Sequence, residues 1–276
     1  ILFSDLVVDD IGFQVLTNPE LEFSNFSGTA GFTHKLSEKS KLFVNHSIAS
    51  RAPNASELFS EGLHHSIARI EIGDLRFKSE VGYKSSLTYV FNGEKLDFSI
   101  NPFINNIQDF LLIEPVELVE TIRGNFPSWE YRQTNAQLFG VDVDTSLKIN
   151  DFLSLNHQLS IVKGYDMERD VPLINMPPIS TKNEISYNNK YLNNLKINLE
   201  SEFVFAQNEY PDNNFEIFLP FTQTTEVLDV STPPDAYHLI NFNSSIDFKV
   251  TENSSLTVGL GTVSYTHLTL PTKQDV

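Results

Sequence analysis

Two adjacent histidines stand close in the sequence to several carboxylates. His64 and His65 lie between Glu61 and Glu71. Imidazole nitrogens and carboxylate oxygens are ligands that divalent metals such as zinc accept. The pattern therefore predicts a metal site formed by His64, His65, Glu61 and Glu71 within one connection of the chain.

Two other interpretations of the same segment stay open. The histidines can pack within the loop or face solvent, because their spacing is not specific to any metal site. Arg51, Glu57 and Glu71 can instead form an ion network that orders the loop. Both interpretations give these residues a structural function.

Other groupings of reactive residue types are weaker. Asp166, Glu168 and Asp170 alternate as the first ligands of a calcium loop do, but the glycine and the terminal Glu of that loop are missing, so we expect a solvated loop. The sequence also lacks a nucleophile elbow, a Gly-rich phosphate loop, a His-Glu-x-x-His pair and any cysteine. We expect neither an enzyme nor a bound cofactor.

Composition excludes further classes. With 36 Asp and Glu against 19 Lys and Arg, the formal charge of −17 argues against a nucleic-acid partner. An apolar fraction of 40% is too high for a disordered chain. No apolar run approaches the about 18 residues of a membrane helix, so a membrane protein would have to cross with strands. The chain begins at Ile1 with neither an initiator Met nor a signal-peptide pattern, so a signal peptide lies upstream or was never there, and we interpret the chain as a fragment.

The elements that must hold these residues are strands, because apolar and polar residues alternate along much of the chain. In residues 139–149 the odd positions are mostly apolar and the even positions polar. Residues 153–161 and 197–205 repeat the pattern. Period-two alternation is typical of strands with one apolar and one polar face.

Connections of two sizes join these strands. Short polar turns are expected at residues 37–40, 92–95, 150–151, 190–194 and 251–253, and long connections at about 51–74, 114–128, 165–177 and 210–236. Their alternation predicts about ten antiparallel strands with short turns at one end and long loops at the other. Several strands exceed the usual soluble length, which favours a transmembrane barrel over a soluble all-β domain.

Charge and aromatic residues follow the same division. The long connections carry most of the net negative charge, and residues 207–236 hold six carboxylates but no Lys or Arg. Such an acidic rim would concentrate cations, but for the charge alone we favour a well-solvated loop surface. Phe126, Trp129, Tyr131 and Tyr210 are predicted to form an aromatic girdle at the membrane interface.

Specific motifs extend this interpretation. The chain resembles the TonB-dependent outer-membrane receptors over about residues 28–262. The residues that carry the resemblance are Arg51-Ala52-Pro53, Glu57-Leu58, Gly62-Leu63-His64, Glu71-Ile72-Gly73, Leu75, Glu80, Gln108-Asp109-Phe110, Phe139-Gly140-Val141-Asp142, Pro172-Leu173, Pro177-Pro178 and Tyr187. The Gly-Leu-His-His segment and Tyr131-Arg132-Gln133-Thr134-Asn135-Ala136 are similar to the zinc and metal uptake branch.

The resemblance implies a fold and a function. The fold would be all-β: an antiparallel transmembrane β-barrel fragment, residues 1–262 supplying about ten of about 22 strands, with short periplasmic turns and long extracellular loops. The implied function is uptake of a scarce nutrient across the Gram-negative cell outer membrane, most simply a metal ion or a metal chelate such as a siderophore, haem or zinc. The implied partners are outer-membrane lipid and lipopolysaccharide, the transported ligand, and the TonB-ExbB-ExbD complex acting through an N-terminal plug region.

Two further expectations complete the sequence-based interpretation. Residues 263–276 lack the aromatic end that family members have, so we expect a non-native tail. The alternative function is a non-transporting surface binding protein, either an adhesin or a porin.

Overall fold

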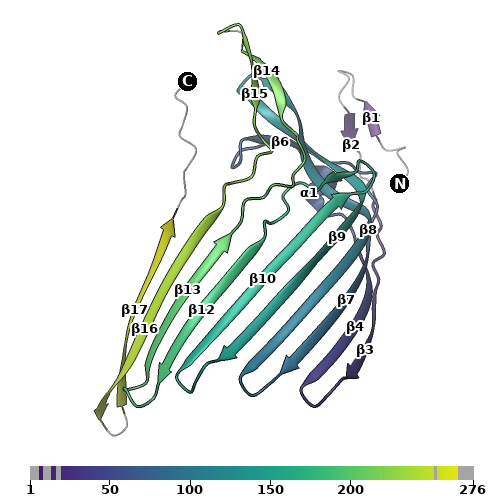
Figure 1. Cartoon of the computed structure of the whole chain (residues 1–276). Coiled ribbons are helices and arrows are strands. Elements are labelled where there is room, and N and C mark those ends of the chain that lie inside the picture. The colour runs from purple at the N-terminus through teal and green to yellow at the C-terminus, as the bar shows by residue number, and fades with distance from the viewer. Residues whose placement is uncertain (1–5, 9–13, 17–19, 220, 252–253, 267–276) are drawn as a thin grey trace.

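The computed structural model describes residues 6–8, 14–16, 20–219, 221–251 and 254–266. Most of them form one strongly curved antiparallel sheet, which Figure 1 shows with its short turns at the bottom and its long connections at the top. The main path of the sheet has ten strands, in the order β17-β16-β13-β12-β10-β9-β8-β7-β4-β3. The predicted number of strands is confirmed.

Along this path each strand pairs with the next main-path strand in the sequence, and the short elements between them lie in the long connections, so the sheet is a meander. Backbone hydrogen bonds are satisfied between adjacent strands, as a sheet in lipid requires. Strand bounds are β3 Ser27–Lys35, β4 Ser40–Arg51, β7 Glu80–Asn92, β8 Leu96–Thr121, β9 Gly124–Lys148, β10 Leu153–Asp166, β12 Ser180–Asn189, β13 Leu195–Val204, β16 Tyr237–Thr251 and β17 Ser254–Thr266.

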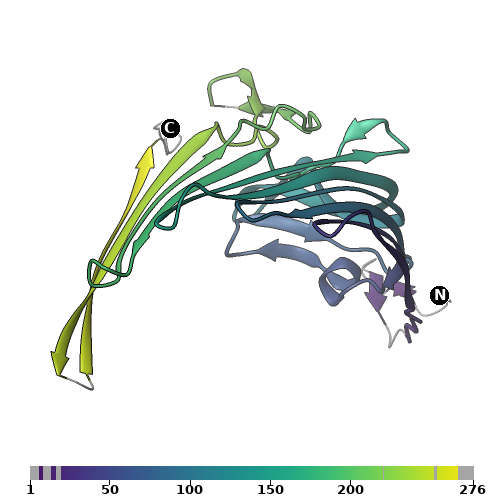
Figure 2. The same ribbon diagram turned by 60° about the horizontal axis from the view of Figure 1, so that its bottom comes forward.

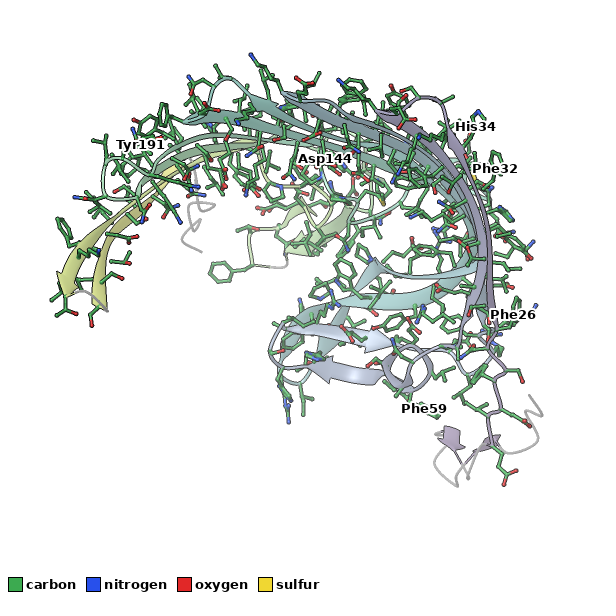
Figure 3. All side chains as sticks on the ribbon, turned by 90° about the horizontal axis from the view of Figure 1, so that it is seen from below. Phe26, Phe32, His34, Phe59, Asp144 and Tyr191 are labelled. Carbon is green, nitrogen blue, oxygen red and sulfur yellow. The ribbon has the colours of Figure 1, made fainter. Side chains whose placement is uncertain are left out.

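The two faces of the sheet differ in polarity. Phe32 lies on the convex side in Figure 3 and Asp144 on the concave side. Large apolar side chains stay exposed along the sheet, among them Phe32 at 63%, Leu199 at 44% and Phe248 at 45%. The alternation seen in the sequence is therefore an apolar outer face and a polar inner face.

The sheet does not close on itself. Figure 2 shows it as an open arc whose two ends are β3 and β17. Within the described residues neither outer edge has a further strand partner along the main path. An open arc of ten strands is what part of a larger barrel would contribute, because a barrel closes only by pairing its edges.

The short turns at residues 37–40, 92–95, 150–151 and 190–194 lie where the sequence predicts them, and residues 252–253 of the fifth predicted turn lie outside the described residues. Asn193 and Asn194 adopt positive φ angles of 55° and 52° between β12 and β13, the conformation that Asn tolerates best among non-glycine residues. At the β9–β10 turn the side chain of Asn150 accepts hydrogen bonds from the backbone N–H groups of Phe152 and Leu153. Local turn chemistry thus fixes the register of neighbouring strands.

One predicted long loop is wrong. Residues 114–128 are not irregular: β8 and β9 continue as a hairpin to Thr121 and Gly124, with 26 and 25 residues respectively. An extended strand of that length spans about 85 Å, whereas about 10 residues suffice to cross a bilayer. The hairpin therefore projects well beyond the sheet. Its prolines and carboxylates concealed the pairing from sequence reasoning.

The first long connection folds against this hairpin. It contains α1 (Ala55–Phe59), β5 (Glu61–His64) and β6 (Arg69–Ile72), and β6 pairs in parallel with β9. A small hydrophobic cluster lies beneath it, formed by Leu58, Phe77 and Leu111 and flanked by Leu21, Phe23, Leu75 and Tyr131. Figure 3 shows this unit inside the arc of the sheet.

The remaining elements are short. They are β11 (Val171–Pro172), the hairpin β14 (Phe215–Leu219) and β15 (Thr224–Leu228), and the pair β1 (Leu6–Val8) and β2 (Gln14–Leu16). Among the described residues no helix is long and apolar enough to cross a membrane. The start of the predicted non-native tail is paired, because β17 continues to Thr266 opposite His238, while residues 267–276 lie outside the described residues.

Candidate functional site

The long connections gather at one end of the sheet and form a loop layer, which we define as residues 51–80, 108–135, 165–179 and 205–236. Three clusters of charged side chains hold it together. Each cluster joins segments that are distant in the sequence, so the layer is ordered by tertiary contacts.

The first cluster centres on Arg51 at the end of β4. Its guanidinium lies 3.0 Å from the carboxylate of Glu57 and 2.7 Å from that of Glu80, and both carboxylates are largely buried. The other oxygen of Glu80 accepts a hydrogen bond of 2.6 Å from the backbone N–H of Leu111. One arginine thus connects β4, α1, β7 and β8.

Local chemistry fixes α1 in this cluster. Asn54 and Glu57 form a reciprocal capping box, with distances of 3.0 and 2.7 Å. A β-carbon added to Gly73 would lie 2.6 Å from the carbonyl oxygen of Glu57, so only glycine allows the chain to pass this closely. The predicted network of Arg51, Glu57 and Glu71 is therefore correct for Arg51 and Glu57 but wrong for Glu71, because Glu80 occupies that place.

The predicted metal ligands lie on two strands of the same unit. Glu61 and His64 are on β5, and the His64 Nδ1 atom is 3.0 Å from Ser66 Oγ. Glu71, on β6, pairs instead with Arg69 at 2.6 Å. His65 is exposed in the following turn. No group of three or more His, Asp or Glu side chains in the described residues is arranged to hold a metal ion, and metal contact at this loop stays a prediction.

The second cluster ties the projecting hairpin to β10. Asp166 has only 1% of its side chain exposed and accepts hydrogen bonds from Arg132 at 2.5 Å and Thr134 at 2.6 Å. Arg132 also contacts Glu114 at 2.6 Å, and Arg169 contacts the same oxygen at 2.7 Å. Asp166 therefore has a structural function, and the expected solvated loop is wrong for this residue, because its side chain is buried and paired.

The surroundings of Asp166 determine its ionisation. Burial alone would raise its pKa, but hydrogen bonds from Thr134, Arg132 and two backbone N–H groups lower the pKa to about 2. The group therefore stays ionised throughout the neutral range. Sequence reasoning noted the residues around position 134 only as a family-like motif, and the spacing of 32 residues to Asp166 gave no sign of the contact.

An irregularity in β8 is fixed from the same hairpin. Asp109 adopts a φ of 53° where the β8–β9 register shifts. The side chain of Gln133 donates to the carbonyl oxygens of Asp109 and Lys78, at 2.9 and 2.8 Å, and accepts from the N–H of Lys78. The bulge thus connects the wall of the sheet to the first long connection.

All four aromatic residues assigned to a membrane girdle, Phe126, Trp129, Tyr131 and Tyr210, lie in the loop layer instead. Trp129 pairs with Glu71 across β6 and β9, and the guanidinium of Arg69 lies 4.6 Å from its ring centre. Tyr131 packs on the small hydrophobic cluster. The girdle prediction is wrong for the three residues on β9, because the hairpin carries them past the sheet.

The third cluster lies on the other side of the layer. Glu209 pairs with Lys163, and it accepts a hydrogen bond of 2.8 Å from the hydroxyl of Tyr165. The neighbouring Gln207 donates to the carbonyl oxygen of Met176 at 3.1 Å. These contacts join β10 and residues 165–179 to residues 205–236, beside a cleft with a volume of about 450 Å³.

Below the layer, polar side chains form ladders across the concave face. Asp142 accepts from Ser160 at 2.8 Å and Asp144 from Gln158 at 3.1 Å, while Lys182 pairs with Glu200 at 2.8 Å. They border a cavity of about 550 Å³. A polar, solvated inner wall fits the interior of a large barrel rather than the core of a soluble sandwich.

The sequence matches the family described as TonB dependent receptor-like, beta-barrel, over residues 4–261. The chain therefore belongs to this family, and it forms part of an outer-membrane receptor barrel. The match agrees with the open sheet, its apolar outer face and its elaborated loop end. No curated protein matches the sequence.

Solved structures show the same fold. The copper transporter OprC is 19% identical, with a TM-score of 0.64 over 84% of this chain and 33% of its own. A variant of the ferric enterobactin receptor PfeA from Pseudomonas aeruginosa is 14% identical, with a TM-score of 0.58 over 84% and 34%. The siderophore receptor PirA from Acinetobacter baumannii is 16% identical, with a TM-score of 0.54 over 85% and 36%. The chain spans about a third of the length of each.

Proposed function

We propose that the protein carrying this chain is an outer-membrane receptor that takes up a metal ion or a metal chelate in a TonB-dependent manner. The observation that carries the proposal is the division of one sheet into an apolar outer face, a polar inner face and a charged loop layer at one end. Family membership and structural similarity to a copper transporter and to siderophore receptors support it.

The parts of the structure suit successive steps. The apolar outer face would contact outer-membrane lipid and lipopolysaccharide, and the loop layer would capture the substrate outside the cell. The polar inner wall would surround a plug region, whose rearrangement through the TonB-ExbB-ExbD complex would admit the substrate. No chemistry on the substrate is required, because the implied reaction is translocation.

His64, His65, Glu61 and Glu71 remain our proposed metal contacts. Glu71 now forms an ion pair with Arg69. The four residues could bind one metal together only if the carboxylate of Glu71 left Arg69 and bound the metal instead. His64 and His65 are free of that constraint and are the first residues to test. Replacing both by Ala in the full-length protein should lower metal-dependent uptake without changing the amount of protein in the membrane.

Uptake by cells tests the function. The full-length protein is expressed in a strain that lacks its own metal and siderophore receptors, and growth on limiting metal is compared in tonB-positive and tonB-negative cells. We expect growth that depends on both the protein and TonB. Uptake that persists without TonB would instead indicate a porin, and surface binding without any uptake would indicate an adhesin.

A further inference from the structure

The cleft beside the third charged cluster is built from three separate segments of the loop layer. They are residues 174–178, 204–210 and 230–237. Its volume of about 450 Å³ lies within the range of small-molecule sites, which bind ligands in concave, largely apolar pockets. We call it the proline–tyrosine cleft, because its walls include Pro177, Pro178, Pro233, Pro234, Tyr210 and Tyr237.

The walls of this cleft are held in place before any ligand arrives. Gln207 donates to the carbonyl oxygens of Met176 and Pro177, at 3.1 and 3.4 Å. On the opposite segment, the side chain of Asn214 accepts from the N–H groups of Val230 and Ser231, at 2.8 and 3.2 Å. A preformed wall lowers the entropic cost of binding.

The side chains that line the cleft determine which shape of ligand it can bind. Proline and tyrosine rings offer flat apolar surfaces, and tyrosine rings also attract cations through their negative faces. The lining also carries side chains that can form hydrogen bonds, namely Asn175, Gln207, Tyr210, Ser231, Thr232, Asp235 and Tyr237. The proline and tyrosine rings on several sides of the cleft suit a flat conjugated ring, which can stack on them.

The charge of the residues around the cleft determines whether it favours a cationic or an anionic ligand. Residues 207–236 contain six carboxylates and no Lys or Arg. Glu209 is paired with Lys163, and Asp229 caps the backbone N–H groups of Ser231 and Thr232. In the described part of the chain, Asp235 on the lining has no ion pair or hydrogen bond with another residue. The field at the cleft is therefore negative.

We propose that the proline–tyrosine cleft binds a flat aromatic group that carries a positive charge, as part of the captured solute. The inference deepens the proposed function, and it rests on that function for the idea that a solute is captured in the loop layer. It excludes an anionic aromatic chelate as the preferred ligand of this cleft, because Asp235 and its neighbours would repel one.

Three probes of similar ring size and different charge test the proposal. N-methylquinolinium is a cation, quinoline is neutral at neutral pH, and 1-naphthoate is an anion. Their binding to the purified full-length protein in a zwitterionic detergent is measured by equilibrium dialysis, with empty micelles as the blank. We expect affinity to fall in the order cation, neutral ring, anion, and added salt to weaken only the binding of the cation.

Variants separate the charge of the cleft from its shape. Asp235→Asn keeps the shape and should weaken N-methylquinolinium binding roughly threefold, with quinoline unchanged. Tyr210→Ala with Tyr237→Ala should weaken both probes roughly tenfold. Glu216→Gln, on β14 of the same acidic segment but not on the lining, is the matched control and should change neither.

The outcomes distinguish this inference from the proposed function. The inference is overturned if the three probes bind with equal affinity, or if neither Asp235→Asn nor the double Tyr variant changes the affinity. This holds even if the cells show TonB-dependent uptake. Charge-ordered binding that responds to Asp235→Asn supports the cleft even if uptake fails. The gel mobility of unheated and heated samples is compared for each variant, because a folded β-barrel migrates differently from its heat-unfolded form. This control distinguishes a loss of binding in the Tyr variant from a loss of the folded barrel.

Discussion

The sheet wall and the loop layer of this protein are stabilised in different ways. The wall has almost no buried core, and its large apolar side chains are exposed on the convex face. The buried apolar residues, including Leu58, Phe77 and Leu111, are found instead in or next to the loop layer, together with the buried carboxylates Glu57 and Asp166. The wall is built to face lipid, and the layer is built as a small water-exposed fold.

This difference explains where charge is tolerated. In the loop layer, buried carboxylates are paired with arginines and backbone N–H groups, since an unpaired buried charge is strongly destabilising. On the wall, charged side chains of the concave face are also paired, as Lys182 is with Glu200. A charge on the convex face would have no partner and no water. Four predictions follow from this comparison, in order of expected effect.

Removing Arg51 should have the largest effect. Arg51→Ala leaves Glu57 and Glu80 largely buried and unpaired, which should destabilise the loop layer by roughly 3 kcal/mol or more. Proteolysis between β4 and β7 should increase while the wall stays intact. Lys39→Ala, which removes an exposed pair with Glu94, is the control and should change nothing measurable.

A charge on the convex face should harm the wall almost as much. Leu199→Arg should reduce the stability of the barrel in bilayers by roughly 2 to 4 kcal/mol, because the side chain faces hydrocarbon. Urea titration of protein folded in lipid vesicles measures this. Ile122→Arg, at the fully exposed tip of the projecting hairpin, should be neutral. Equal sensitivity at both positions would contradict the division into two environments.

Adding a side chain at Gly73, where the backbone passes close to Glu57, should have an intermediate effect. Gly73→Ala places a β-carbon 2.6 Å from the carbonyl oxygen of Glu57, so α1 must shift, at a cost of about 1 to 3 kcal/mol. Hydrogen exchange of the α1 amides should accelerate. Gly28→Ala in β3 meets its nearest atom at 3.8 Å and should leave exchange unchanged.

Protonation of Asp166 should have the smallest of the four effects, because this carboxylate changes its charge only well below neutral pH. The pKa of Asp166 is lowered to about 2 in the folded protein, so its stabilising contribution is complete above its unfolded value of about 3.9. The contribution should be lost as the pH falls from about 4 towards 2. The protection of β10 amides from hydrogen exchange, corrected for the pH dependence of the intrinsic exchange rate, should therefore be constant above this window and decrease within it. Asp166→Asn should remove that dependence, and a transition near neutral pH would contradict the assignment.

The sequence was informative about the wall because the wall obeys local rules. Alternation in residues 139–149 specifies which side faces lipid, and polar turns such as 190–194 mark each reversal of the chain. One face of each strand is apolar, so a register slip would turn that face inward, and pattern alone nearly determines the pairing. The short helix α1 was not foreseen, since five residues leave little periodicity.

The loop layer was less predictable because its contacts are distant in sequence. Arg51 and Glu80 are 29 residues apart, and Arg132 and Asp166 are 34 apart. Nothing local indicates that β6 would pair in parallel with β9, or that residues 114–128 would extend a hairpin. The metal ligands were predicted only from their proximity in sequence. That proximity did not indicate that Glu71 would form an ion pair with Arg69.

Labelling in intact cells tests the central claim most directly. The chain has no cysteine, so a single introduced thiol reports its own position once any cysteine elsewhere in the full-length protein is replaced. Ile122→Cys, in the loop layer, should react with a bulky impermeant maleimide in intact cells. Tyr191→Cys, at a short turn, should react only after the outer membrane is permeabilised. The reverse order, or equal reaction at both positions, would contradict an outward loop layer on a membrane-embedded wall.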